Sequence, residues 1–149
     1  MDCRNALLEA GGDKEKALEI LKKQNLFKAE KSKKRSTSQG LVETYLHSGG
    51  RVGAMVEMNC ETDFVARTEE FKKLAHEIAM QIAAMDPQFI SQEEVTPETD
   101  AEFETVCLLL QPYIRDPAVK IQDLINEAIA KTGENIRIKR FARFELGDE

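Results

Sequence analysis

Residues 51–60 read RVGAMVEMNC, and their side chains alternate between an apolar face and a mostly polar one. The apolar face carries Val52, Ala54, Val56, Met58 and Cys60. A period of two is typical of a β-strand with one buried face. Residues 42–47 also alternate, and Ser48-Gly49-Gly50 between the two stretches favours a tight turn. We therefore predict a hairpin between Gly40 and Cys60 with one covered face.

Helical periodicity begins shortly after this hairpin. Apolar residues recur every three or four positions at Phe71, Leu74, Ala75, Ile78, Ala79, Ile82 and Met85. Asp86-Pro87 marks the end of the helix, because the residue before a proline disfavours helical conformation. This helix can cover the apolar face of the hairpin.

The C-terminal run predicts one more strand. Its apolar face carries Ile136, Ile138, Ala142, Phe144 and Leu146, whereas Phe141 is expected on the opposite, otherwise polar side. A strand that follows helices most simply joins the hairpin as its third strand. The predicted fold class is therefore α+β, a small antiparallel sheet with helices on one face.

Two further helices are expected before this last strand. Thr96-Pro97 predicts the start of one that carries Phe103, Val106, Cys107 and Leu110. Asp116-Pro117 predicts the start of another, which ends at Thr132-Gly133. Residues 86–104 contain seven acidic residues and no basic one, so at least the first half of this stretch is expected to be an exposed connection.

The first 38 residues predict a small helical module and a linker. Gly11-Gly12 separates two short helices, and Asp13 can cap the second. Basic residues prevail from Lys28 to Arg35 and three hydroxyl residues follow, a composition typical of an exposed linker, although a basic run can also contact nucleic acid. We divide the chain into a helical module at 1–27, a basic linker at 28–38 and an α+β core at 39–149.

Composition excludes several classes of protein. The net charge of -6 over 149 residues argues against a general nucleic-acid binder. We expect a cytoplasmic protein, since no apolar run is long enough for a membrane span and no signal peptide is recognisable. Cys3, Cys60 and Cys107 form no CxxC pair, so neither a zinc site nor a disulfide framework is predicted. No cofactor is expected either, because the glycine pairs lack the context of a phosphate-binding loop.

Catalytic chemistry finds little support in the sequence. His76-Glu77 begins like a zinc-protease motif, but Met80 stands where the second histidine belongs. We expect His76 to be an exposed helix residue. Glu57, Glu61 and Asp63 are close enough in sequence to serve as an acid and base pair, yet they can equally decorate a strand edge and a loop.

The junction between the second strand and the long helix carries an unusual aromatic residue. Phe64 lies seven residues before Phe71, so it can extend the buried helical stripe, with Asp63 as an ordinary N-cap. Phe64 can equally be an exposed anchor for a partner protein, with Asp63 as a competing charge. The residues alone do not decide between these two interpretations.

Residues 59–67 read NCETDFVAR and resemble the N-C-E-T-D-F-V-A-R signature of the bacterial and organellar elongation factor Ts family. Other stretches match the same family in the same order along the chain: Met1–Leu7 with Gly12-Asp13, Tyr45–Val56, Leu109–Ile114 with Asp116-Pro117, and Lys131–Ile136 with Arg140-Phe141 and Arg143-Phe144. The resemblance implies the dimerisation-domain core of that family, preceded by part of its ubiquitin-associated-like module.

The resemblance also implies a function, that of a guanine nucleotide exchange factor rather than an enzyme. Such a factor binds elongation factor Tu with GDP and inserts Asp63 and Phe64 between partner helices. The insertion disturbs the Mg²⁺ and phosphate site, so GDP leaves and GTP can bind. Thr62 and Val65 would complete the Mg²⁺-dislocating segment. Secondary partner contacts would come from Met1, Asp2, Cys3 and Arg67.

Further expectations follow from the family pattern. No direct nucleic-acid or membrane contact is implied, and the sequence leaves a homodimer open. The family places another helix before the Met1-Asp2-Cys3 motif, so we expect the N-terminal module to be partial and loosely held. The connection from Ser91 to Val106 is shorter than the family's helical stretch there. Two alternatives remain: an interaction module without exchange activity that uses the same aromatic loop, and a small hydrolase built on Glu57, Glu61 and Asp63.

Overall fold

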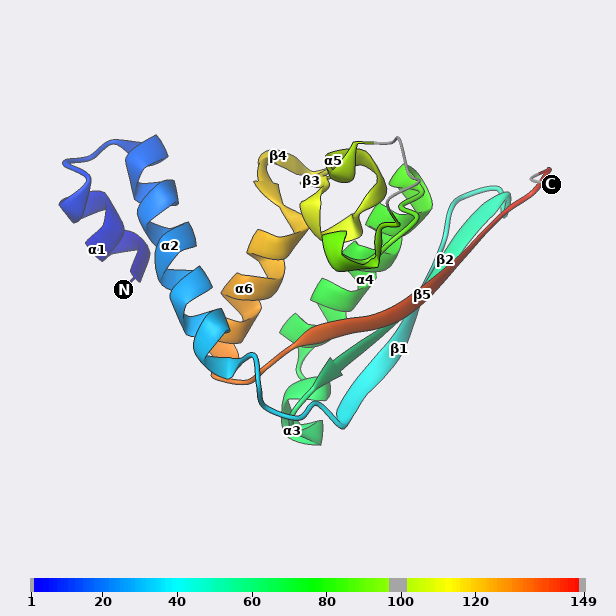
Figure 1. Ribbon diagram of the computed structural model, residues 1–149, viewed down its shortest axis with the longest axis horizontal. Coiled ribbons are helices and arrows are strands. Elements are labelled where there is room, and N and C mark those ends of the chain that lie inside the picture. Colours follow the sequence, from blue (N-terminus) through cyan, green and yellow to red (C-terminus); the bar gives the residue numbers. More distant parts are fainter. Residues whose placement is uncertain (1, 97–101, 148–149) are drawn as a thin grey trace.

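The computed structural model describes residues 2–96 and 102–147, and a three-stranded antiparallel sheet forms one side of the molecule. Strand β2 (Val52–Cys60) lies between β1 (Gln39–Leu46) and β5 (Arg137–Glu145) (Figure 1). The pairing runs from Gln39 opposite Cys60 to Leu46 opposite Gly53. The predicted hairpin, third strand and α+β fold class are therefore confirmed.

The covered face of the sheet is the one that the alternation of β2 predicts. Val56, Met58 and Cys60 are completely buried. Helix α4 (Glu69–Met85) packs on this face against β1 and β2, with its predicted stripe of apolar residues inward. Its end is also as predicted, because Asp86 takes a left-handed conformation with φ of 47°.

Helices follow one another away from the sheet in Figure 1. Helix α6 (Ile121–Thr132) contacts α4, α2 (Lys14–Ser32) packs on α6, and α1 (Asp2–Glu9) packs on α2. The core runs through these layers from Ala29 on α2 to Val56 on β2.

A bulge in β5 overturns the expected position of Phe141. The pairing of β2 with β5 shifts between Glu57 and Met58, where Ile138 and Arg140 are successive partners and Lys139 is skipped. Because of the extra residue, each side chain of β5 after the bulge lies on the face opposite to the one that the alternation predicts. Phe141 therefore lies opposite Val56 and packs on the core, while Phe144 turns outward and is 78% exposed.

The connection after α4 also differs from the prediction. Pro87 is buried, and Phe89 bridges Cys107, so the first part of this stretch is not simply exposed. A 3-10 turn, η1, spans Gln92–Glu94. The expected start of a helix at Thr96-Pro97 includes Pro97, which lies outside the described residues.

The helix expected through Leu110 is replaced by two short turns, α5 (Phe103–Val106) and the 3-10 turn η2 (Leu108–Leu110). Residues 116–120 are likewise not the beginning of α6. They form β4 (Asp116–Lys120), which pairs with β3 (Pro112–Tyr113). The helix start at Asp116-Pro117 was therefore wrong by five residues, although Gly133 ends α6 as predicted.

A buried glutamine network holds this small hairpin on α4. The Gln81 amide nitrogen donates to Gln111 Oε1 at 3.2 Å and to Pro112 O at 3.0 Å. Its oxygen accepts from the backbone N–H of Ile114 at 3.0 Å. Among the described residues, no buried side-chain nitrogen or oxygen lacks a partner. Tertiary hydrogen bonds, which a sequence period does not encode, thus decide the chain path at 111–120.

The predicted linker begins inside a helix. Helix α2 continues to Ser32, and both Ala29 and Ser32 are buried, so residues 28–32 are not an exposed linker. The cause is packing against α6, together with an ion pair between Lys22 and Asp123 at 3.4 Å. Basic side chains on the outer face of a helix produced a linker-like composition.

Candidate functional site

The NCETDFVAR motif lies where β2 leaves the sheet. Its centre forms a single helical turn, α3 (Asp63–Ala66), at the lower end of the molecule in Figure 1. Thr62 Oγ1 caps this turn by accepting from the N–H of Val65 at 3.3 Å. The N-cap is therefore Thr62 and not Asp63, which corrects one of the two interpretations of the junction.

Phe64 is exposed. Its exposed fraction is 79%, whereas Val65 and Ala66 are buried at 6% and 7%. A one-turn helix sends consecutive residues in different directions, and here Val65 and Ala66 face the sheet while Phe64 faces outward. Phe64 does not extend the buried stripe of α4, and that interpretation is wrong.

Charged side chains flank the exposed ring. Asp63 Oδ2 and Arg67 Nη2 are 3.3 Å apart, with side chains 62% and 80% exposed. Asp63, Phe64, Arg67 and Thr68 line a shallow hollow. The turn thus presents an apolar ring beside an ion pair that a partner can break and replace.

Glu134 anchors the segment that leads into α3. Its Oε1 accepts from the backbone N–H groups of Glu61 at 3.1 Å and Thr62 at 3.0 Å. Its Oε2 accepts from Thr62 Oγ1 at 2.7 Å. The sequence does not predict this role, although residues 131–136 resemble the family pattern.

The carboxylate of Glu61 links the same two segments, the one that leads into α3 and the loop after α6, in the opposite direction. Glu61 Oε1 accepts from the backbone N–H of Asn135 at 2.7 Å and lies 3.5 Å from Arg35 Nη1. The side chain of Asn135, which is 4% exposed, donates to the carbonyl of Arg35 at 2.8 Å. The end of α2, the root of α3 and the loop after α6 therefore meet at one point.

Cys60 completes the root of the turn. Its buried thiol donates to the carbonyl of Thr62 at 3.1 Å. Burial, and secondarily the carboxylate of Glu134, raise the pKa of the Cys60 thiol. The thiol is thus held in the protonated form that donates this hydrogen bond.

The three carboxylates considered for a hydrolase are each engaged by a different arginine. Glu57 accepts from Arg140 Nε at 2.8 Å, Glu61 faces Arg35, and Asp63 faces Arg67. An acid and base pair needs two carboxyl groups directed at one reacting atom. This arrangement argues against the hydrolase.

The other candidate residues are placed elsewhere. Met1 lies outside the described residues, Asp2 opens α1, and Cys3 is exposed on that helix. Helix α1 packs on α2, whereas α3 packs on the sheet and α4, so the structure does not join the N-terminal set to the motif. His76 is exposed as predicted, with its ring edge-on to Tyr45.

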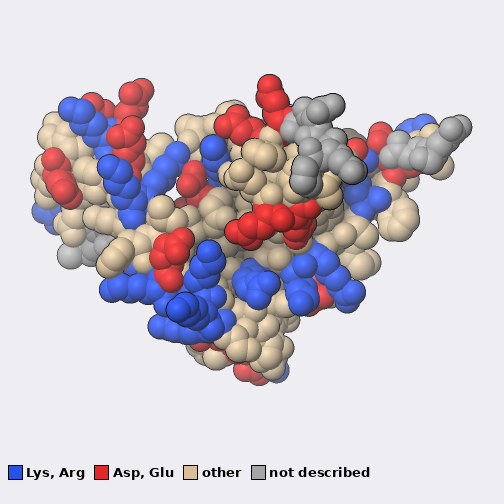
Figure 2. Space-filling view, in the orientation of Figure 1, with Lys and Arg blue, Asp and Glu red and all other residues tan. Residues whose placement is uncertain are grey.

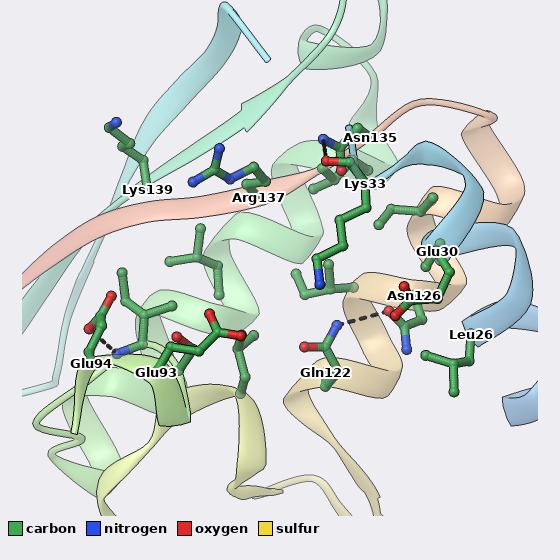
Figure 3. A pocket seen from close by; sticks show the side chains of 18 residues that line it. Leu26, Glu30, Lys33, Glu93, Glu94, Gln122, Asn126, Asn135, Arg137 and Lys139 are labelled. Carbon is green, nitrogen blue, oxygen red and sulfur yellow. Dashed lines mark hydrogen bonds between the residues drawn. The ribbon is translucent and has the colours of Figure 1, made fainter. Parts of the chain in front are cut away.

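A hollow of about 650 Å³ lies between α2, α6 and β5 (Figure 3). Lys33 reaches into it from the end of α2, Arg137 and Lys139 come from β5, and Glu93 and Glu94 lie on the opposite side. The lining also includes the apolar Ile125 and Ile129, and Gln122 donates to Asn126 at 2.8 Å within it. Charges of both signs favour neither a free anion nor a metal ion, and we assign this hollow no ligand.

Charge is unevenly distributed over the surface. Basic side chains gather over the end of α2 and along β5, and acidic side chains cover the connection after α4 (Figure 2). Over residues 2–96 and 102–147, no three His, Cys, Asp or Glu side chains cluster so that they could hold a metal ion. No helix within these ranges is long and apolar enough to cross a membrane.

Comparison with known proteins identifies a family. The family model described as Elongation factor TS matches residues 14–106. Elongation factor Ts of Thermotoga petrophila is 48% identical over 176 positions, covering 99% of this chain and 88% of that protein. The proteins of the same name from Caldanaerobacter subterraneus subsp. tengcongensis and Carboxydothermus hydrogenoformans are 47% and 46% identical over 178 positions, covering 99% of this chain and 89% and 82% of those proteins. These alignments exceed the 149 residues of the chain, so the relatives carry residues that it lacks.

Proposed function

Because this chain belongs to the elongation factor Ts family of translation elongation factors, we propose that it binds elongation factor Tu and promotes the release of its GDP. The chain acts in this proposal as a guanine nucleotide exchange factor and performs no covalent chemistry. GTP can then occupy the emptied site. The single observation that carries the proposal is the exposure of Phe64, 79%, on a turn whose other apolar side chains are buried.

The mechanism follows from the chemistry of a bound nucleotide. Mg²⁺ neutralises phosphate charge, so displacing it leaves repulsion between the phosphates and their surroundings. In the proposal, Phe64 enters between partner helices. Asp63 breaks its ion pair with Arg67 and pairs with groups on the partner instead. Thr62 and Val65 hold the turn from below. Burying an exposed aromatic side chain supplies much of the binding energy that this displacement needs.

Exchange imposes a reciprocal relation between the two ligands of the partner. A factor that weakens GDP binding must itself bind the nucleotide-free partner more tightly by the same ratio. The basic band over the end of α2 and along β5 lies near α3 and would favour an acidic partner surface (Figure 2). Association should therefore slow as ionic strength rises.

A nucleotide-release assay tests this function. Elongation factor Tu is loaded with fluorescent GDP, and its release is followed with a substoichiometric amount of the chain in excess unlabelled GDP. The proposal expects release that accelerates with added chain and is restrained by added Mg²⁺. An unchanged release rate together with measurable binding would support the alternative, an interaction module without exchange activity.

We also propose a role for the N-terminal residues. Residues 1–27 would dock on a partner surface separate from the nucleotide site, with Met1, Asp2 and Cys3 among the contacts, while residues 39–149 carry the exchange activity. A chain lacking residues 1–13 should give the same maximal release rate, but that rate should be reached only at a higher concentration of the chain.

We further infer that the outer face of the sheet pairs with a second copy of the chain. Val42, Leu46, Met55, Phe144 and Leu146 are all at least 50% exposed on or beside this face. Contiguous exposed apolar side chains of this kind typically mark an interface. Sedimentation equilibrium should reveal a dimer that Phe144→Asp dissociates, and a monomer at every accessible concentration would exclude it.

A further inference from the structure

We propose that Glu134 is a positioning residue for the exposed Phe64 ring, an inference that rests on the proposed exchange function. Glu134 is separated from Thr62 by 72 positions in the sequence and belongs to the loop after α6. Among the described residues, its carboxylate accepts from Glu61 and Thr62 and makes no hydrogen bond to Asp63 or Phe64. Its role is to fix the root of the turn that carries Phe64.

The turn cannot hold this geometry by itself. Helix α3 has only four residues, and a single helical turn is unstable in isolation because nucleation costs more than one hydrogen bond returns. Phe64 makes few contacts of its own, since it is 79% exposed. The direction of its ring therefore depends on how Thr62 and Val65 are held on either side.

Glu134 controls the Thr62 side through three donors. The backbone N–H groups of Glu61 and Thr62 and the hydroxyl of Thr62 all donate to one carboxylate, at 3.1, 3.0 and 2.7 Å. Hydrogen bonds to a charged acceptor are stronger than neutral ones. The same hydroxyl accepts from Val65 N–H, so the orientation of Thr62 Oγ1 passes directly into the cap of α3.

The hydrogen bond that Glu61 accepts from Asn135 extends this support to the end of α2. Glu61 receives Asn135 N–H at 2.7 Å, and Asn135 in turn donates to the carbonyl of Arg35 at 2.8 Å. Arg35 Nη1 donates to the carbonyl of Gly133 at 2.8 Å. The loop at 133–135 is thus the common support of α2 and α3, and Glu134 is its contact with the functional turn.

Variants of Glu134 separate positioning from folding. Glu134→Ala removes all three acceptor contacts, whereas Glu134→Gln keeps the shape and one acceptor oxygen. Glu127→Ala is the matched control, because Glu127 lies on α6 and, among the described residues, its ion pair is with Lys131 on the same helix, at 2.8 Å. GDP release, thermal unfolding and amide hydrogen exchange at residues 61–65 are measured for each full-length variant.

We expect release to fall about tenfold in Glu134→Ala and less in Glu134→Gln, the scale of losing charge-assisted hydrogen bonds. Amide exchange at Glu61 and Thr62 should accelerate in the free chain, and Glu127→Ala should match the wild type. Adding Phe64→Ala to Glu134→Ala should lower the release rate by a smaller factor than Phe64→Ala does alone, because a ring that is already misdirected contributes less to release.

Each contrary result has a separate meaning. If Phe64→Ala slows release but Glu134→Ala does not, the positioning role is wrong and the exchange function stands. Fully multiplicative losses in the double variant, or unchanged amide exchange at 61–65, would also overturn positioning. If the wild-type chain releases no GDP, both the function and this inference fail. Should Glu134→Ala not fold, the Glu134→Gln variant carries the same comparisons.

Discussion

Phe64 and Phe71 are seven residues apart and occupy opposite environments, one 79% exposed and the other 3% exposed. Seven residues are two helical turns, so a continuous helix would put both rings on one face. The chain avoids this with two separate caps, Thr62 for α3 and Thr68 for α4. The break between the two helices is what turns Phe64 outward.

Replacing Phe71 with alanine should destabilise the fold. Phe71 packs in the core beneath the sheet, and truncating a buried phenylalanine costs about 3–5 kcal/mol. Urea unfolding followed by circular dichroism measures the loss. A cost below about 1 kcal/mol would mean that α4 is not seated on the sheet as described.

Thr62 and Asp63 should respond differently to alanine substitution. Thr62→Ala removes the α3 cap and a donor to Glu134, so it should cost about 1 kcal/mol of stability or more. Asp63→Ala breaks an exposed ion pair and should change stability by no more than about 0.5 kcal/mol. Thermal melts with release kinetics decide this, and a larger stability loss for Asp63→Ala would contradict the assignment of the cap.

Stability should fall in strongly alkaline solution through Tyr113. Burial, and then its 2.6 Å hydrogen bond to Glu77, raise the pKa of Tyr113 from the ordinary 10.0 to about 12. The folded chain keeps a proton that the unfolded chain releases, so the contribution is complete below pH 10 and is lost as pH rises to about 12. The melting difference between wild type and Tyr113→Phe should shrink over that window. A constant difference would show that the phenol does not titrate as described.

The first helix should exchange its amide protons faster than α4. In the part of the chain that the structure describes, the main packing partner of helix α1 is α2, and Leu8 near the end of α1 is 69% exposed. Local opening is easiest where little apolar surface is buried. Hydrogen exchange resolved by residue tests this, and equal protection in α1 and α4 would indicate an anchor that the structure does not reveal.

Sequence periodicity was sufficient where burial alone decides the fold. The strict alternation at Val52–Cys60 and the stripe at Phe71–Met85 became β2 and α4. Periodicity failed at Lys139, because a bulge adds one residue and reverses the faces that follow. It failed again at residues 116–120, where pairing with β3 competes with the helical preference of Asp116-Pro117.

The candidate site was predictable only in part. The motif residues were identified from sequence, but whether Phe64 is core or surface depended on where the break between α3 and α4 falls. The contact between Glu134 and Thr62 spans 72 positions and leaves no periodic signal. Aligned relatives in which Thr62 and Glu134 vary together would have been the signal to look for.

The most direct measurement compares GDP release from elongation factor Tu by Phe64→Ala and by Phe103→Ala. Both substitutions truncate an exposed phenylalanine, but Phe103 is 42% exposed on α5, at the opposite end of the molecule from α3 (Figure 1). We predict that Phe64→Ala keeps the wild-type melting temperature and loses most of its exchange activity, while Phe103→Ala retains it. Undiminished release by folded Phe64→Ala protein would contradict the proposed mechanism.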